Sequence, residues 1–248
     1  MKDFEDSTLW RISAFERARA AGESAGIGLD RPTLLPTTLL ADLRRLEADP
    51  AANDVVEVIA ACLRHRESAL LYLAHGPYVW PVTLFPAQHL FHSPRDVTDI
   101  AAETALSRLK LISAEPPGVL PPGHSKHERV AAADKYRPLT GLLWAVALHG
   151  PRDTLLAEIG GRAAYRLAAG RVDELPASLG ALLPAARRLK AESASLRDMA
   201  GWPGMSTQRA CRLLNALYLT GALMITRSHP SARDESAAGW RGLLGRKR

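Results

Sequence analysis

Cysteines and long apolar runs are scarce in this sequence, and each absence excludes a class of protein. The 248 residues include only two cysteines, Cys62 and Cys211, too few for a disulfide framework or a four-cysteine zinc site. The longest uninterrupted apolar run, residues 142–148, is far shorter than the roughly 18–20 residues of a membrane-spanning helix. The acidic N-terminus lacks the apolar core of a signal peptide. We therefore expect a cytoplasmic protein without an integral membrane segment.

Sequence motifs of phosphate and metal sites are missing or incomplete. The chain has neither a P-loop nor a G-x-G-x-x-G fingerprint. The glycine-rich residues 22–28 do not follow a predicted strand, so we interpret them as a helix stop. Two histidine pairs, His89 with His92 and His124 with His127, lack the further ligands that a metal ion needs. We interpret these histidines as structural or solvated and predict no metal and no cofactor.

The apolar content, 47% of the residues, is typical of a globular protein, and its periodicity predicts an α+β fold. Residues 1–115 combine helical with strand-like spacing, which predicts a sensor or docking domain built from a small antiparallel sheet and helices. Pro81 predicts that its strand lies at an edge or a bulge of the sheet. The helices are expected at 8–21, 37–46, 54–64 and 96–109, and the strands at 68–74, 78–85, 88–92 and 110–114.

The middle of the chain separates this domain from the C-terminal end. Residues 116–135 are rich in proline and glycine and are interpreted as a loop or linker. Residues 136–194 are expected to be connecting helices. These helices are predicted at 139–149, 153–159, 162–167 and 175–190, the last with an interruption at Pro184.

The last quarter of the chain contains start and stop signals for two successive helices. Ser195 and Asp198 have capping-box spacing at the start of the first helix. Ser206 can cap the second helix, and Gly204 stands in the turn between the two. Gly221 follows the second helix, where a glycine commonly ends one. The buried stripe of the second helix is predicted at Ala210, Leu213, Leu214 and Leu217.

This pattern resembles the winged helix-turn-helix modules of bacterial regulatory and signalling proteins. The resemblance implies a helical C-terminal domain over residues 195–230 with a recognition helix over 206–219. In DNA-binding members the first turn of that helix enters the major groove, where arginine pairs with guanine and glutamine with adenine. Other members dock proteins or dimerise through the same fold. The candidate contact residues on this helix are Thr207, Gln208, Arg209 and Arg212.

The positive charge of the chain, a net +6, is concentrated at its C-terminal end. Residues 1–194 hold 23 basic and 23 acidic side chains, so their net charge is zero. Residues 195–226 add a net +2 and residues 227–248 a net +4, which permits a polyanionic partner. The basic tail, residues 231–248, supplies the remaining candidate DNA- or partner-binding residues, Arg246, Lys247 and Arg248.

We predict a non-enzymatic regulatory or signalling adaptor whose C-terminal domain contacts a protein partner. The predicted recognition helix offers few polar side chains, and no second wing strand follows Ile225, which favours protein contact. The alternative is a sequence-specific DNA-binding transcription regulator that uses the 206–219 helix. A third hypothesis is an enzyme with a site near residues 78–92. Homo-oligomerisation stays open.

Overall fold

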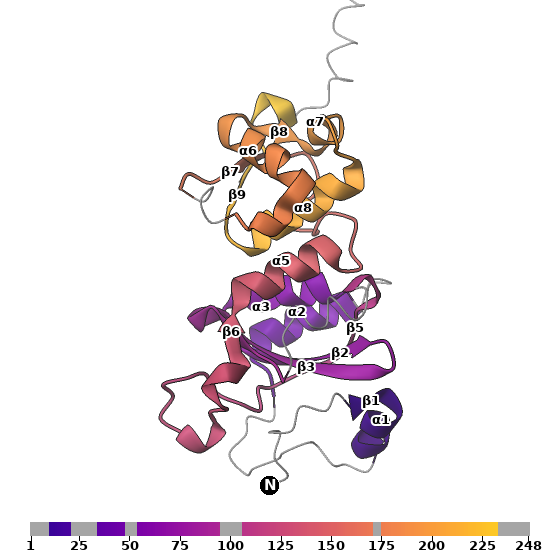
Figure 1. Cartoon of the computed structure of the whole chain (residues 1–248), viewed down its shortest axis with the longest axis vertical. Helices are drawn as coiled ribbons and strands as arrows, with labels where there is room; N and C mark the ends of the chain where they lie inside the picture. Colours follow the sequence, from indigo (N-terminus) through magenta and orange to yellow (C-terminus); the bar gives the residue numbers. More distant parts are fainter. Residues whose placement is uncertain (1–9, 21–33, 48–53, 95–105, 171–174, 233–248) are drawn as a thin grey trace, which may run out of the picture. The chain divides into compact units, whose positions relative to one another are not determined.

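The chain divides into two compact units, unit 1 (Met1–Arg152) and unit 2 (Asp153–Arg248). Both combine helices with antiparallel strands (Figure 1), which confirms the predicted α+β class. The first sheet extends beyond residue 115, where the sequence placed a domain end, because residues 136–138 join it. The computed structural model describes residues 10–20, 34–47, 54–94, 106–170 and 175–232.

Unit 1 is built on one antiparallel sheet in the order β5-β2-β3-β4-β6, with β1 paired to the start of β3. Strands predicted at 68–74, 78–85 and 110–114 are confirmed to within one residue at each end, and the strand predicted at 88–92 is shorter because Pro86–Gln88 form a 3-10 turn. The strands are β1 (Trp10–Arg11), β2 (Ala69–His75), β3 (Tyr78–Phe85), β4 (Leu90–His92), β5 (Lys110–Glu115) and β6 (Tyr136–Pro138).

Pro81 lies in β3, which is a central strand of this sheet and not an edge strand as predicted. It pairs with Tyr72 of β2 on one side. On the other side β1 reaches only Val79 and β4 begins only opposite Thr83. At Pro81, therefore, β3 has a neighbouring strand only on the β2 side. On the other side no strand is present to accept a hydrogen bond from the N–H that proline lacks.

Alternate residues of β2 and β3 pack to the two faces of the sheet. Tyr72 and Val79 form a cluster with Phe15 of α1 (Ile12–Ala20), whose ring centroid lies 4.8 Å from that of Tyr72. The other face carries Leu71 and Trp80, both fully buried. Figure 1 shows α1 on one side of the sheet, and α2 (Thr37–Glu47), α3 (Val55–His65) and α5 (Leu139–His149) on the other.

The predicted helices 37–46, 54–64 and 139–149 are confirmed, whereas the first helix begins late. Residues 10–11 pair with β3, so α1 starts at Ile12 instead of at residue 8. Most of the helix predicted at 96–109 lies outside the described residues, and only a 3-10 turn, Leu106–Arg108, is seen. Among the described helices, none has the length and apolarity to cross a bilayer.

The start of α3 is held by a partly buried ion-pair network. Asp54 is the N-cap, and its carboxylate accepts hydrogen bonds from the backbone N–H groups of Val56 at 2.8 Å and Glu57 at 3.3 Å. Arg152, the last residue of unit 1, pairs with that carboxylate and, at 2.9 Å, with the carboxylate of Glu57. The three side chains are only 10–14% exposed. Arg152 thus pairs with both carboxylates at the helix start.

Unit 2 contains a three-stranded antiparallel sheet in the order β8-β7-β9. The central strand β7 comes first in the chain, and helix α6 packs against it. The elements are β7 (Ala164–Leu167), α6 (Leu183–Ala191), β8 (Ala194–Ser195), α7 (Leu196–Ala200), α8 (Thr207–Leu219) and β9 (Leu223–Thr226), with 3-10 turns at Ala177–Leu182 and Pro230–Ala232.

Three of the predicted connecting helices differ from the structure. Of residues 162–167, the last four, Ala164–Leu167, form strand β7, in which buried Tyr165 and Leu167 alternate with exposed Arg166; a run this short is ambiguous between helix and strand. Residues 153–159 form turns because their backbone bonds to a side chain of α8. The segment predicted at 175–190 is divided at Gly180, whose φ of +45° interrupts the helical backbone.

We expect Arg152→Ala to lower the free energy of unfolding of unit 1 by about 3 kcal/mol, because it leaves two partly buried carboxylates without their cation. The matched control is Arg45→Ala, since Arg45 is 84% exposed and its nearest carboxylate oxygen, on Asp42, lies at 3.7 Å. That change should cost less than about 0.5 kcal/mol. Urea unfolding measures both, and equal effects would contradict the role given to Arg152.

Candidate functional site

Helices α7 and α8 begin where the sequence predicts them. The Ser195 hydroxyl accepts a hydrogen bond from the backbone N–H of Asp198 at 3.2 Å, and the Asp198 carboxylate accepts one from the backbone N–H of Ser195 at 2.9 Å. The Ser206 hydroxyl accepts from the backbone N–H of Arg209 at 3.2 Å. The predicted capping box and the second cap are therefore confirmed.

The turn between α7 and α8 depends on a glycine and a buried tryptophan. Gly204 has a φ of +75°, a backbone conformation that residues with a Cβ rarely adopt. Trp202 is buried, and the guanidinium of Arg188 lies 4.5 Å from its ring centroid. The backbone N–H of Met205 donates to the Trp202 carbonyl at 3.0 Å. The Trp-Pro sequence thus anchors the turn beneath α6.

Helix α8 is buried along the predicted stripe and ends at the predicted glycine. Gly221 has a φ of +69°, and its N–H donates to the Tyr218 carbonyl at 2.9 Å. The next N–H, of Ala222, donates to the Leu217 carbonyl at 2.8 Å, which completes a Schellman end. The stripe residues are all fully buried: Ala210, Leu213, Leu214 and Leu217.

The predicted contact residues of α8 lie mostly in its first turn. Thr207, Gln208 and Arg209 are exposed, while Arg212 is half-buried. Arg209 donates from Nη1 to the Gly204 carbonyl at 2.6 Å, and Nε2 of Gln208 lies 3.5 Å from a carboxylate oxygen of Asp153. The side chains with base-reading chemistry therefore already bond within the protein. The tail residues Arg246, Lys247 and Arg248 lie outside the described residues.

A residue that the sequence analysis did not single out, Asn215, organises the same helix face. Its amide is buried, donating to the Thr154 carbonyl at 2.9 Å and accepting from the Leu156 N–H at 3.0 Å. Gln208, Arg212 and Asn215 follow one another at four- and three-residue steps and so share one face. Residues 153–156 consequently lie along that face. The available signal was an asparagine inside the otherwise apolar run of residues 213–217.

The strand after α8 does have a partner, although no strand follows it in the described residues, which end at 232. Strand β9 pairs along its length with β7, with Arg166 opposite Met224 and Tyr165 opposite Ile225. The guanidinium of Arg227 then donates to the carbonyls of Gly160 at 3.0 Å and Glu158 at 3.2 Å. The sheet is therefore completed by a strand that precedes α6.

The histidine pairs do not converge on a common point. His89 is exposed with a φ of +55°, whereas His92 is half-buried in β4 with its ring centroid 5.3 Å from that of Tyr136. In the other pair, Nδ1 of His124 accepts from the backbone N–H of Lys126 at 3.2 Å. No group of three or more metal-ligating side chains occurs within the described ranges.

Residues 22–26 read Gly-Glu-Ser-Ala-Gly and match the G-x-S-x-G spacing of a hydrolase nucleophile elbow. That elbow requires a strand directly before the serine turn and a helix after it. Here the preceding described residues form helix α1, which ends at Ala20, and residues 22–26 lie outside the described part. The local context therefore does not favour an elbow.

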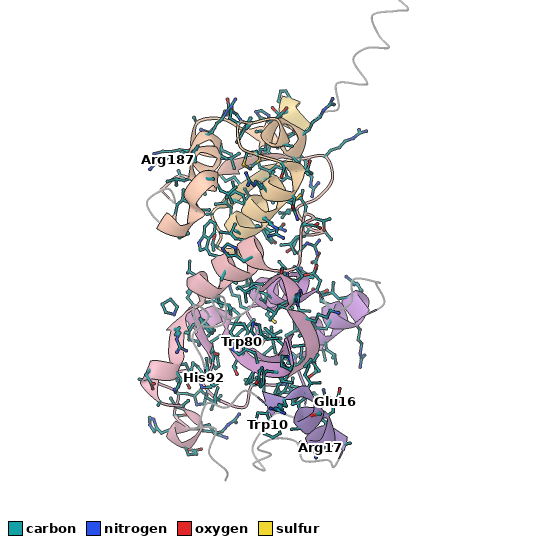
Figure 2. The ribbon with its side chains drawn as sticks, turned by 45° about the vertical axis from the view of Figure 1, so that its right-hand side comes forward. Trp10, Glu16, Arg17, Trp80, His92 and Arg187 are labelled. Carbon is teal, nitrogen blue, oxygen red and sulfur yellow. The ribbon has the colours of Figure 1, made fainter. Side chains whose placement is uncertain are left out.

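The strands around residues 78–92 are packed as a core. Trp80 is fully buried and its indole Nε1 donates to the Ser93 hydroxyl at 2.7 Å; Figure 2 shows it inside unit 1. Nearby in sequence, His75 is buried with no recorded partner for Nε2. Burial raises the pKa of the Cys62 thiol to about 12, so this cysteine is protonated and weakly nucleophilic at neutral pH.

No family model, curated protein or solved structure matches the chain. Its function therefore has to follow from the geometry of its own residues. The face of α8 from Gln208 to Asn215, with residues 153–156 bonded along it, and the β7–β9 pair are the features on which a functional proposal rests.

We expect Asn215→Leu to lower the free energy of unfolding of unit 2 by about 2 kcal/mol, because it removes the buried amide that bonds to the Thr154 carbonyl and the Leu156 N–H. Hydrogen exchange of the Leu156 amide should accelerate. The control is Thr220→Ala on the same helix, since the Ala216 carbonyl that Thr220 Oγ1 contacts also accepts the Thr220 N–H. An Asn215→Leu protein as stable as wild type would contradict this interpretation.

His92 should make stability depend on pH. Burial, then the nearby charges of Arg137 and Lys135, lower its pKa from 6.5 to about 4. Between these values the unfolded chain binds a proton that the folded chain does not, so stability is complete above pH 6.5 and falls as the pH decreases toward 4. His92→Gln should remove about 3 kcal/mol of that decrease, measured by urea unfolding at several pH values. The control, His127→Gln at an exposed position, should keep the wild-type slope.

Proposed function

We propose that this chain is a non-enzymatic regulatory or signalling adaptor whose unit 2 contacts another protein. The observation that supports it most directly is the occupied face of α8. Asn215 binds Thr154 and Leu156, and the Gln208 amide lies against Asp153. A helix that reads DNA needs its polar side chains free to reach base edges in the major groove. On α8 that face is bonded to the protein itself.

The chemistry of the titratable groups is consistent with a non-enzymatic role. Asp42 accepts from the guanidinium of Arg64 at 2.5 Å and lies 2.8 Å from Nε2 of His65. The hydrogen bond to His65 and the positive charge of Arg64 lower the pKa of Asp42. Asp54 and Glu57 are similarly paired with Arg152. These groups stabilise helix starts and helix packing, which is a structural use of charge.

The second candidate is a DNA-binding regulator, and two observations favour it. Thr207, Gln208 and Arg209 are exposed at the start of α8, which is the part of a recognition helix that contacts bases in helix-turn-helix proteins. The net positive charge of the chain also resides in residues 195–248. Both observations are compatible with a protein partner of negative charge, so the two functions have to be separated by experiment.

Site-specific photo-crosslinking in the source cells separates them. A photoreactive amino acid replaces Thr207 or Met224, both exposed in unit 2, or, as the control, Leu34, which is 73% exposed in unit 1. The adaptor proposal expects one dominant protease-sensitive product from a unit 2 position and none from Leu34. Products sensitive to nuclease instead of protease, or equal products from all three positions, would contradict it.

A DNA titration of the purified chain gives the complementary result. Binding to mixed genomic fragments is followed by fluorescence anisotropy at about 50 and 200 mM salt. We expect only weak binding that higher salt abolishes and that Arg209→Ala and the unit 1 control Arg45→Ala weaken equally. Tight binding to particular fragments that Arg209→Ala alone removes would favour the DNA-binding regulator.

A further inference from the structure

Residues 10–20, which form β1 and α1, cover part of one face of the unit 1 sheet but are themselves hardly buried (Figure 1). Within this segment, which we call the cover, Phe15 is the only buried residue. The partly buried Ile12 packs beside it. By contrast, eight of the eleven residues of α3 are buried. The cover is therefore attached to the sheet mainly through one aromatic side chain.

Beneath Phe15 lies an apolar patch on strands β2 and β3. It consists of Leu70, Tyr72 and Val79, all buried, and we call these three side chains the sheet patch. The rings of Phe15 and Tyr72 are tilted by 49° at a centroid distance of 4.8 Å. Departure of the cover would expose the sheet patch to water, and exposed apolar patches commonly mark interaction sites.

The other attachments of the cover lie close to solvent. Strand β1 contributes two paired residues, Trp10 and Arg11, whose side chains are exposed. The backbone N–H of Ile12 donates to the Pro77 carbonyl at 3.0 Å. Helix α1 has nine residues, fewer than the roughly 12–15 that an isolated helix needs to be even marginally stable. We therefore expect the cover to open locally more readily than the rest of unit 1.

The rim of the sheet patch carries an acid that α1 meets with an arginine. Glu115 of β5 is the cross-strand neighbour of Leu70, and Nη2 of Arg19 lies 3.6 Å from its carboxylate. The same guanidinium lies 5.6 Å from the ring centroid of Phe15. Lys110 stands at the opposite end of β5, so the acid marks one end of the patch. Helix α1 thus offers the patch an aromatic side chain and, four residues later, a cation.

We propose that the sheet patch is a docking surface for a helix of a partner protein, and that α1 occupies it as an autoinhibitory cover which the partner displaces. The contacts of α1 define the chemistry of the partner. It is an amphipathic helix with an aromatic residue that packs on Tyr72 and a basic residue four positions later that pairs with Glu115. This inference concerns unit 1 and goes beyond the function proposed for unit 2.

The chemistry of the surface selects this occupant over an acidic segment, a nucleic acid or an added strand. The sheet patch is apolar, and the carboxylate of Glu115 at its rim repels carboxylates and phosphates. Strand β2 already pairs with β5 and β3 on its two sides, so an added strand would find no free backbone groups beside it. A helix with an apolar face covers such a surface, as α1 does.

The test measures binding of a fluorescent peptide with the sequence of residues 10–20 to the full chain. In wild type the covalently attached cover competes for the sheet patch, so we expect weak binding. Phe15→Ser removes the anchor of the cover and should lower the dissociation constant at least about tenfold, because the patch is then free in more molecules. Equal binding to wild type and to Phe15→Ser, or no binding to either, would overturn the inference.

A peptide that carries Phe15→Ala is the control for specific docking, since it lacks the aromatic side chain that packs on Tyr72. It should bind neither chain. Binding of this peptide with the affinity of the unmodified one would contradict the role given to the aromatic residue.

Two exposed variants repeat the test without changing a buried residue. Arg19→Glu places a second carboxylate beside Glu115, so it should weaken the cover and tighten peptide binding several-fold. Arg17→Glu is the matched control, because it makes the same charge change on α1 at a guanidinium that donates to the Ser13 carbonyl of the same helix; Figure 2 labels Arg17 at the surface. This control should bind as wild type does. Equal tightening by both variants would contradict the pairing of Arg19 with Glu115.

Hydrogen exchange of the wild-type chain measures the opening of the cover without any variant. The amide protons of residues 16–20 in α1 should exchange at least about tenfold faster than those in the middle of α3. If the two helices exchange at the same rate, the cover opens only together with unit 1, and displacement by a partner is wrong.

A second copy of the chain is the alternative occupant, and light scattering identifies it. A wild-type dimer that Phe15→Ser dissociates would show that the cover is exchanged between copies and would overturn the partner role. A monomeric wild type that gains peptide binding when the cover is weakened supports the inference. Crosslinking at positions 207 and 224 tests unit 2 alone, so failure of the peptide would leave the proposed function standing.

Discussion

The buried amide of Asn215 is the interaction on which unit 2 depends most. It satisfies one donor and one acceptor of an irregular segment, residues 153–156, that has no ladder of its own. Buried backbone groups without partners are costly, so the two bonds from the asparagine favour the position of this segment against α8. One buried polar residue of α8 thereby holds residues 153–156 along the face that it shares with Gln208 and Arg212.

This arrangement explains why the local features of α8 do not by themselves identify what the helix binds. Helix α8 has a capped start, a buried stripe and a glycine end, which together define its position. Its first-turn side chains face the turn carbonyl of Gly204 and the carboxylate of Asp153. A fold of this kind is a scaffold, and the chemistry left at its surface decides the partner. In unit 2 the exposed side chains at the start of α8 are Thr207, Gln208 and Arg209.

Elements specified by local signals were predictable from the sequence, and those specified by distant contacts were not. The N-caps Ser195 and Ser206 lie a few residues from the backbone groups that they bind, so α7 and α8 could be recognised. Residues 164–167 form a strand because β9 and β8 pair with them. The site followed the same rule: Thr207 to Arg209 were predicted from helix position, whereas Asn215 acts through a segment that lies more than fifty residues earlier.

The position of β7 at the centre of the second sheet has a consequence for how the unit forms during synthesis. Tyr165 of β7 pairs with Ile225 of β9, and α6, α7 and α8 lie between these two strands in the sequence. The β7–β9 pair can therefore form only after all three helices have been synthesised. Pairings of such long sequence separation form late and slowly. They also mean that residues 195–230 expressed alone would leave β9 without its neighbour. The helix pair and its sheet therefore form one structural unit, which includes β7 from the early part of unit 2.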